Sequence, residues 1–164
     1  MGPAETATVL DLSRAYQLGV AIAEQGWVLL TGGRQAGVMA AASQGAKAAG
    51  GLTLGILPGG DGAEAAEGVD IAIVTDLGQA RNNINVLTAD VTIACGMGLG
   101  TASEIALALK AGKQVILLAD APEAACFFQG LAGDRLKVVA TVEAALDWVK
   151  AILHELQTGP RPRH

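Results

Sequence analysis

The chain has 164 residues, enough for one domain with a substantial core and too few for two. Hydrophobic residues make up 51% of it and aromatic residues only 3%, so its interior must be built from Ala, Val, Ile and Leu. The net charge of −5 argues against a nucleic-acid-binding protein, which typically carries a basic stripe. Neither a signal peptide nor an apolar run of membrane-spanning length occurs, so we expect a cytoplasmic protein without membrane segments.

The first third of the chain alternates between helical and strand-like patterns. Residues 13–26 carry apolar positions at helical spacing and end in a glycine, and residues 38–51 are a second, small-residue helix. Between them, residues 27–31 form a continuous apolar run, which is typical of a strand buried on both faces.

The same alternation continues to the end of the chain. We predict strands over 52–58, 69–75, 91–95, 113–120 and 135–140, and helices over 78–90, 101–112, 121–133 and 141–157. Regular alternation with short loops predicts an α/β fold, a Rossmann-like doubly wound parallel sheet in three α/β/α layers. We expect residues 1–157 to form a single nucleotide-binding domain and residues 158–164 to be a flexible tail.

The amino terminus is unusual for this fold. Doubly wound sheets normally open with a central strand, whereas MGPAETAT looks like the loop that would follow one. Two alternatives are open at this point: the first strand is missing from the sequence, or the sheet does without it.

Three loops that follow predicted strands are the candidate ligand site, because ligands of such sheets bind beyond the carboxyl ends of the strands. They are TGGRQAG (31–37), TDLGQARN (75–82) and CGMGLGT (95–101). The first and third expose backbone N–H groups at a helix start, an arrangement that binds phosphate. Two such loops at one edge favour a small phosphorylated ligand over glycines that only turn the chain. The predicted binding residues of the two loops are Gly32, Gly33, Arg34, Gly37, Gly96, Gly98, Gly100 and Thr101.

Charged and amide side chains near these loops each allow two interpretations. Arg81 either is solvated or pairs with Glu104 or with a ligand phosphate, and Asn82 and Asn85 would add polar groups on the same face. Glu104 either completes a capping box with Thr101 or accepts from a ribose hydroxyl, and the two roles are compatible. For Arg34, contact with a ligand phosphate and exposure to solvent are about equally favoured by the sequence.

The remaining reactive residue types do not assemble into a site. Cys95 and Cys126 lie in apolar stretches, and we expect both to be buried free thiols of a reducing compartment. The cysteines and histidines lack metal-ligand spacing, so we expect no metal site.

Residues 29–51, 79–96 and 98–117 together resemble the SLOG superfamily of Rossmann-like proteins, and the resemblance extends over about residues 13–120. That superfamily includes the lonely-guy phosphoribohydrolases, once mislabelled lysine decarboxylases, and the molybdenum-cofactor carrier proteins. The lonely-guy motif Pro-Gly-Gly-x-Gly-Thr-x-x-Glu falls on 96–101 and Glu104, and the preceding catalytic Arg falls on Arg81. The resemblance therefore implies catalytic roles for Arg81 and Glu104 if this chain is a hydrolase.

Two departures from the hydrolase motif point to the carrier branch and its uncharacterised bacterial relatives. Gly96 and Met97 replace the Pro and the first Gly, and Asn82 follows Arg81 where the hydrolases favour Lys. The resemblance thus implies a carrier that binds a nucleotide or a molybdopterin-type cofactor as its ligand and requires no other cofactor. The alternative is cleavage of the N-glycosidic bond of a nucleoside 5′-monophosphate, with Glu104 stabilising an oxocarbenium-like transition state. A third function, DNA handling, is weakened by the acidic charge.

The resemblance also implies a homodimer or homotetramer. Apolar positions on the predicted helix 101–112, such as Ile105, Ala108 and Leu109, would supply the faces that a small domain leaves uncovered.

Overall fold

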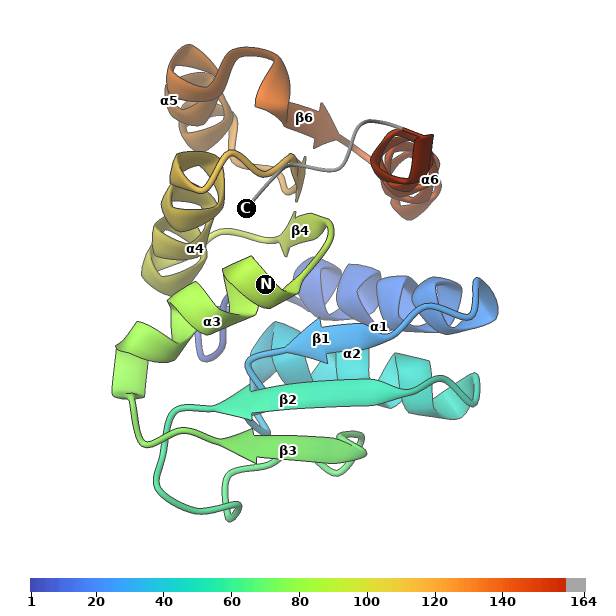
Figure 1. The fold of residues 1–164 in the computed structure, drawn as a ribbon, viewed down its shortest axis with the longest axis vertical. Coiled ribbons are helices and arrows are strands. Elements are labelled where there is room, and N and C mark those ends of the chain that lie inside the picture. The colour runs from blue at the N-terminus through green and yellow to red at the C-terminus, as the bar shows by residue number, and fades with distance from the viewer. Residues whose placement is uncertain (159–164) are drawn as a thin grey trace.

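A computed structural model describes residues 1–158 of the chain, and Figure 1 shows their arrangement. The elements follow one another in the predicted order of alternating helices and strands. The helices are α1 (Val9–Glu24), α2 (Gly37–Ala48), α3 (Arg81–Thr88, preceded by a 3-10 turn over Gly78–Ala80), α4 (Leu99–Lys110), α5 (Pro122–Ala132) and α6 (Val142–Thr158). The strands are β1 (Leu29–Thr31), β2 (Thr53–Leu57), β3 (Ile71–Val74), β4 (Thr92–Cys95), β5 (Val115–Leu118) and β6 (Leu136–Val139). The predicted tail, except for Thr158, lies outside the described residues.

The strands are all parallel and form two three-stranded halves. One half has the order β1-β2-β3 and the other β4-β5-β6. Met1 lies where the halves meet: its amino group donates to Ile93 O at 2.8 Å, and Cys95 N–H donates to Met1 O at 2.8 Å. A single residue therefore stands where the fold normally has its first strand.

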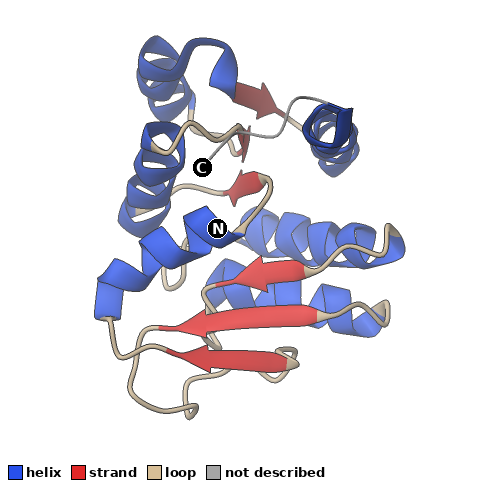
Figure 2. Cartoon of the chain, viewed as in Figure 1, coloured by secondary structure: helices blue, strands red, loops and turns tan. Residues whose placement is uncertain are grey.

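Helices cover both faces of the strands, as the doubly wound prediction requires (Figure 2). Alternation along β5 assigns its side chains to two cores. Ile116 and Leu118 pack in a cluster with α1, α2 and α6, whereas Val115 and Leu117 pack in a cluster with α3, α4 and α5. All four side chains are fully buried, and β5 is the middle strand of its half.

Small residues let α1 and α2 interlock at close range. A Cβ at Gly19 would lie 2.0 Å from Ala42 O, and one at Gly45 would lie 2.1 Å from Tyr16 O. Neither position can accept a larger residue without separating the helices. The small residues that the composition favours over aromatic ones are therefore what allows this helix pair to pack closely.

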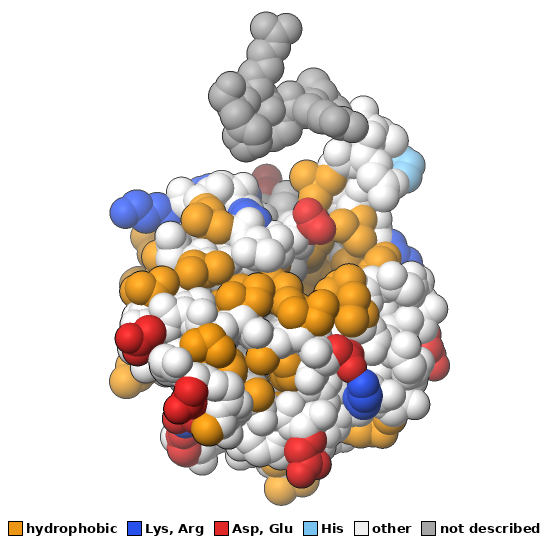
Figure 3. Space-filling view, turned by 60° about the horizontal axis from the view of Figure 1, so that its bottom comes forward, with side chains coloured by type: hydrophobic (Ala, Val, Ile, Leu, Met, Phe, Trp, Pro, Cys, Tyr) orange, Lys and Arg blue, Asp and Glu red, His pale blue; other side chains and the backbone are white. Residues whose placement is uncertain are grey.

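The helical cover thins at the edge strand β3. Ile71, Ile73 and Val74 are each more than 40% exposed. Figure 3 turns the side of the molecule on which β3 lies toward the viewer and shows hydrophobic side chains gathered in a band across that face. No helix within residues 1–158 is long and apolar enough to cross a bilayer.

The apolar face predicted to need an oligomeric partner is instead covered within the chain. Ile105 and Ala108 are 0% exposed and Leu109 is 8% exposed, because α4 packs against β5 and α3. That part of the oligomer prediction is wrong. The large apolar side chains most exposed on the helices are Val9, Leu99, Phe127 and Leu131.

Candidate functional site

The two predicted glycine loops lie at the same edge of the sheet, because both follow parallel strands. The loop after β1 begins at Gly32, and the loop after β4 begins at Gly96. The amino-terminal segment lies between them: Val38 N–H donates to Pro3 O at 3.0 Å, and a Cβ at Gly98 would lie 3.3 Å from Pro3 Cβ. The amino-terminal segment therefore lies at the edge of the candidate site together with the two predicted glycine loops.

Arg81 is the cation at the centre of this edge. It is the first residue of α3 and only 8% exposed, which excludes a solvated surface role. Its guanidinium lies over the main chain of Gly32, since a Cβ there would stand 2.3 Å from Nη1 and 2.7 Å from Nη2. The absence of a side chain at position 32 is therefore what admits the Arg81 head group.

The electrostatic surroundings of Arg81 suit an anionic ligand. Burial lowers the pKa of Arg81, the charge of Glu104 raises it, and the positive charge of Arg34 lowers it. Two guanidinium groups thus act on each other in a chain whose net charge is negative. A bound anion would relieve their mutual repulsion and replace the hydration that Arg81 has lost.

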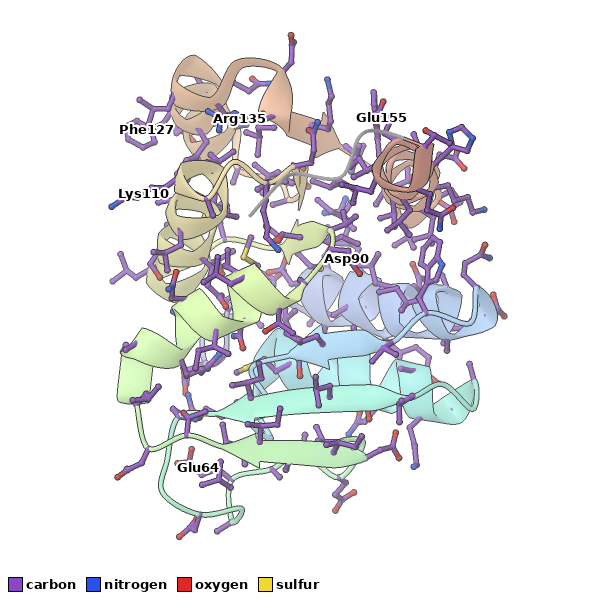
Figure 4. The ribbon with its side chains drawn as sticks, in the orientation of Figure 1. Glu64, Asp90, Lys110, Phe127, Arg135 and Glu155 are labelled. Atoms are coloured by element: carbon purple, nitrogen blue, oxygen red, sulfur yellow. The ribbon has the colours of Figure 1, made fainter. Side chains whose placement is uncertain are left out.

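Arg34 stands at the rim rather than in the centre. It approaches Glu5 at 3.4 Å and Glu64 at 3.5 Å, and its side chain is about one-third exposed. Figure 4 shows Glu64 in the part of the chain that follows β2. Surface ion pairs of this kind contribute little to stability, so Arg34 can exchange a carboxylate for a ligand at small cost.

Asn85 and Asn82 connect α3 to α4. Asn85 Nδ2 donates to Glu104 Oε1 at 3.1 Å, and Asn82 Nδ2 donates to Ser103 Oγ at 3.2 Å. Glu104 is 7% exposed, and within residues 1–158 it forms no ion pair with Arg81. The hypothesis of a direct Arg81–Glu104 pair is therefore wrong for this structure, because Asn85 is the group that contacts the carboxylate.

Thr101 does not cap α4. The helix begins earlier than predicted, at Leu99, with Gly98 as a cap that has no side-chain hydrogen bond. Thr101 and Glu104 consequently lie inside the helix, and the expected capping box is wrong. Thr101 is 1% exposed, so its hydroxyl faces the protein interior.

Three buried polar atoms at this edge have no hydrogen-bond partner among the described residues. They are Arg81 Nε, Asn85 Oδ1 and Thr101 Oγ1. Buried polar atoms are normally paired, and an unpaired one costs roughly 1–3 kcal/mol. Of these three residues, Asn85 lines a small cavity of about 50 Å³, whose lining also includes Gly32 and Glu104.

Of the other glycines predicted to bind the ligand, most lie in close contact with neighbouring residues, and one has open space around it. Gly33 has φ +75° and lies against Gly55 and Leu57, whereas Gly37 lies against the carbonyl groups of Pro3 and Ala4. Gly96 has φ +75° and lies against the Asp11 carboxylate, which belongs to the capping box of α1. Gly100 has open space around it.

The amino-terminal loop is the part of the site that was not predicted as a set of binding residues. Thr8 caps α1 through a full capping box with Asp11, so this helix also begins at the candidate site. The sequence did carry a signal, because MGPAETAT resembles the loop after a first strand. The Thr8–Asp11 spacing of a capping box marks where that loop ends.

Only one of the two cysteines is buried as predicted. Cys95 is buried and Cys126 is exposed, so the prediction of two buried thiols is wrong for Cys126. Burial raises the pKa of Cys95 to about 11. In the part of the chain that the structure describes, no group of His, Cys, Asp and Glu side chains could hold a metal ion.

Two solved structures resemble the chain over nearly its full length. The molybdenum cofactor binding protein of the phototrophic bacterium Rippkaea orientalis is 56% identical, with a TM-score of 0.92 over 93% of this chain and 94% of that one. The Moco carrier protein of Chlamydomonas reinhardtii is 51% identical, with a TM-score of 0.89 over 95% and 96%. Both similarities confirm the Rossmann-like fold.

The sequence of the chain is also similar to that of an enzyme, and it matches the model of one protein family. A cytokinin riboside 5′-monophosphate phosphoribohydrolase of Mycobacterium tuberculosis is 36% identical over 101 residues, which span 60% of this chain and 53% of that protein. The sequence model of the SLOG cluster4 family matches residues 1–146. The chain therefore belongs to the SLOG cluster4 family.

Proposed function

We propose that the protein is a carrier that binds a phosphorylated pterin of the molybdenum-cofactor type at the edge formed by the two glycine loops and the amino-terminal segment. The similarity to two molybdenum-cofactor-binding proteins over nearly the whole chain supports this class of ligand. The observation that carries the proposal is local: Arg81, Asn85 and Thr101, on the two helices that follow the loops of this edge, each hold a buried polar atom without a partner.

The unpaired atoms match the chemistry of such a ligand. Arg81 Nε can only donate, which suits a phosphate oxygen, and the Thr101 hydroxyl can donate to the same group. Asn85 Oδ1 can only accept, which suits an N–H group of a pterin ring or a hydroxyl group of a sugar. Main-chain N–H groups at the start of α4, next to the open space at Gly100, would add neutral donors for the phosphate.

Ligand binding can be tested by thermal shift with three probes: a phosphorylated pterin, AMP and inorganic phosphate. We expect the melting temperature to rise most with the phosphorylated pterin. Arg81→Met with Thr101→Val should weaken binding at least tenfold, since a charge-assisted hydrogen bond contributes about 1.5–3 kcal/mol. Lys150→Ala removes an exposed cation of α6 and is the matched control. No shift with any probe would refute the proposed site.

The alternative function is hydrolysis of a nucleoside 5′-monophosphate. It is favoured by the buried Glu104 carboxylate near Arg81 and by the similarity to the mycobacterial phosphoribohydrolase. In that reaction Glu104 would stabilise positive charge at the anomeric carbon while water attacks it. Release of free base from AMP, abolished in Glu104→Gln, would establish the enzyme; its absence in a protein that binds AMP would leave the carrier.

A further inference from the structure

The loops that follow β1 and β2 are joined by their main chains. The two strands are parallel neighbours, so both loops leave the sheet at the same edge. Gln35 N–H donates to Glu64 O at 3.0 Å, and Ala66 N–H donates to Gly33 O at 2.8 Å. The loop after β2 is therefore held in place against the first glycine loop of the candidate site.

The segment that follows β3 is joined to the loop after β2 in the same way. Asp76 N–H donates to Gly59 O at 2.9 Å, and Gly78 N–H donates to Pro58 O at 2.9 Å. Only a short 3-10 turn separates this segment from Arg81 at the start of α3 (Figure 1). The segment is thus fixed on two sides relative to the Arg81 head group.

Asp76 has an unusual backbone conformation within this segment. Its φ is 52°, and among residues 1–158 it is the only residue other than glycine with a positive φ. This region is costly for most residues, and aspartate and asparagine tolerate it better than the others do. The carboxylate lies over the bare main chain of Gly60, where a Cβ would stand 3.3 Å from Oδ1. Backbone and neighbour together place this exposed carboxylate at the edge of the sheet.

The carboxylate of Asp76 is not engaged by the protein, unlike the other carboxylates of these loops. Glu5 and Glu64 both approach Arg34, and Asp61 accepts from a main-chain N–H group of its own loop at 3.0 Å. Within residues 1–158, the side chain of Asp76 accepts no hydrogen bond and forms no ion pair. Its acceptor positions are therefore available to a ligand.

The distance from Asp76 to the phosphate site matches one class of ligand. β1 and β3 are separated by one strand, so their carboxyl ends lie about 10 Å apart. Gly32, at the end of β1, is where the Arg81 head group lies. A ligand that spans the two points carries a phosphate at one end and hydrogen-bond donors at the other, with a ring system between them.

We propose, on the basis of the proposed function, that Asp76 is a specificity-determining residue that binds the 2-amino-4-oxopyrimidine edge of the ligand. On this edge a ring N–H and the adjacent amino group point the same way, so each can donate to one oxygen of the carboxylate. A pterin and a guanine base share this edge. Adenine presents an acceptor nitrogen beside its amino group, and that nitrogen would face the carboxylate with its lone pair. Asp76 thus selects against adenine nucleotides at the same phosphate site.

Titration calorimetry with neopterin 3′-phosphate, GMP, AMP and inorganic phosphate tests this assignment. We expect the wild type to bind GMP at least tenfold more tightly than AMP. Asp76→Asn keeps the size of the side chain and tolerates the same backbone conformation, but it replaces one acceptor by a donor. It should weaken binding of neopterin 3′-phosphate and GMP at least tenfold and leave AMP and phosphate unchanged. Asp120→Asn, which removes an exposed carboxylate after β5 in the other half of the sheet, is the matched control.

The outcomes separate this inference from the proposed function. Unchanged affinity for neopterin 3′-phosphate in Asp76→Asn would overturn the role of Asp76 and leave the carrier function standing. An equal loss for all the probes would also overturn it, because Asp76 would then act on the phosphate site and not on the ring. No binding of any probe by the wild type would refute both proposals. GMP binding more tightly than neopterin 3′-phosphate, with the same loss in Asp76→Asn, would confirm the role of Asp76 and overturn the pterin as ligand.

Discussion

The guanidinium of Arg81 lies against the bare main chain of Gly32, with Nη1 only 2.3 Å from where a Cβ would stand. Gly32→Ala should therefore displace the Arg81 head group, whose flexible end can move at a cost of about 1 kcal/mol of folding free energy. We expect at least a tenfold loss of affinity for the phosphorylated pterin with little loss of stability. Titration calorimetry measures the first effect and urea unfolding the second.

Gly130→Ala is the matched control for this substitution. Gly130 lies in α5, and a Cβ at this position would have no atom within 4 Å, so alanine should stabilise the helix by about 0.5–1 kcal/mol and leave binding unchanged. Undiminished affinity in Gly32→Ala would show that the position of Arg81 does not govern binding.

The contact between Asn85 and Glu104 should be stabilising, because it is the hydrogen bond that the buried carboxylate accepts within residues 1–158. Asn85→Leu should lower the free energy of unfolding by about 1–3 kcal/mol, the cost of leaving a buried polar group unpaired. In the Asn85→Leu background, Glu104→Leu should cost less than it does alone. Asn83→Leu, on the exposed side of the same helix, is the control. Additive effects in this double-mutant cycle would exclude coupling between the two side chains.

Acid stability should depend on Asp70, at the start of the exposed edge strand. Hydrogen bonds from Lys47 and then from Thr53 lower the pKa of Asp70 from 3.8 to about 2. Because the folded-state pKa is the lower one, this contribution to stability is complete above pH 3.8 and is lost as the pH falls toward 2.

Asp70→Asn should flatten the fall in unfolding free energy between about pH 4 and pH 2. Urea unfolding at half-unit pH intervals measures it, with Glu155→Gln as the variant that also removes one exposed carboxylate (Figure 4). Identical slopes in the wild type and Asp70→Asn would contradict the assignment.

The sequence was sufficient to predict the order of elements and that the two glycine loops lie at one edge of the sheet. Apolar runs and glycine stops depend on local chemistry, and Arg81 stood out as an isolated cation between two glycine loops. The predictions were wrong where tertiary contacts determine the start of a helix or the partner of a side chain. Gly98 rather than Thr101 is the N-cap of α4, Asn85 rather than Arg81 contacts Glu104, and spacing alone indicates neither.

The two cysteines should differ strongly in their reactivity toward alkylating reagents. Cys95 is 2% exposed, and burial raises the pKa of its thiol to about 11, so at pH 8 it is neither accessible nor ionised in the folded protein. Cys126 lies exposed on α5. Iodoacetamide should therefore label one thiol of the native protein and two in denaturant, with peptide mass spectrometry identifying the sites.

Native Cys126→Ser should remain unlabelled over the time in which the wild type reacts fully. Labelling of Cys95 at the rate of Cys126 would mean that the apolar cavity between β1 and β4, which Cys95 lines, opens readily to solvent.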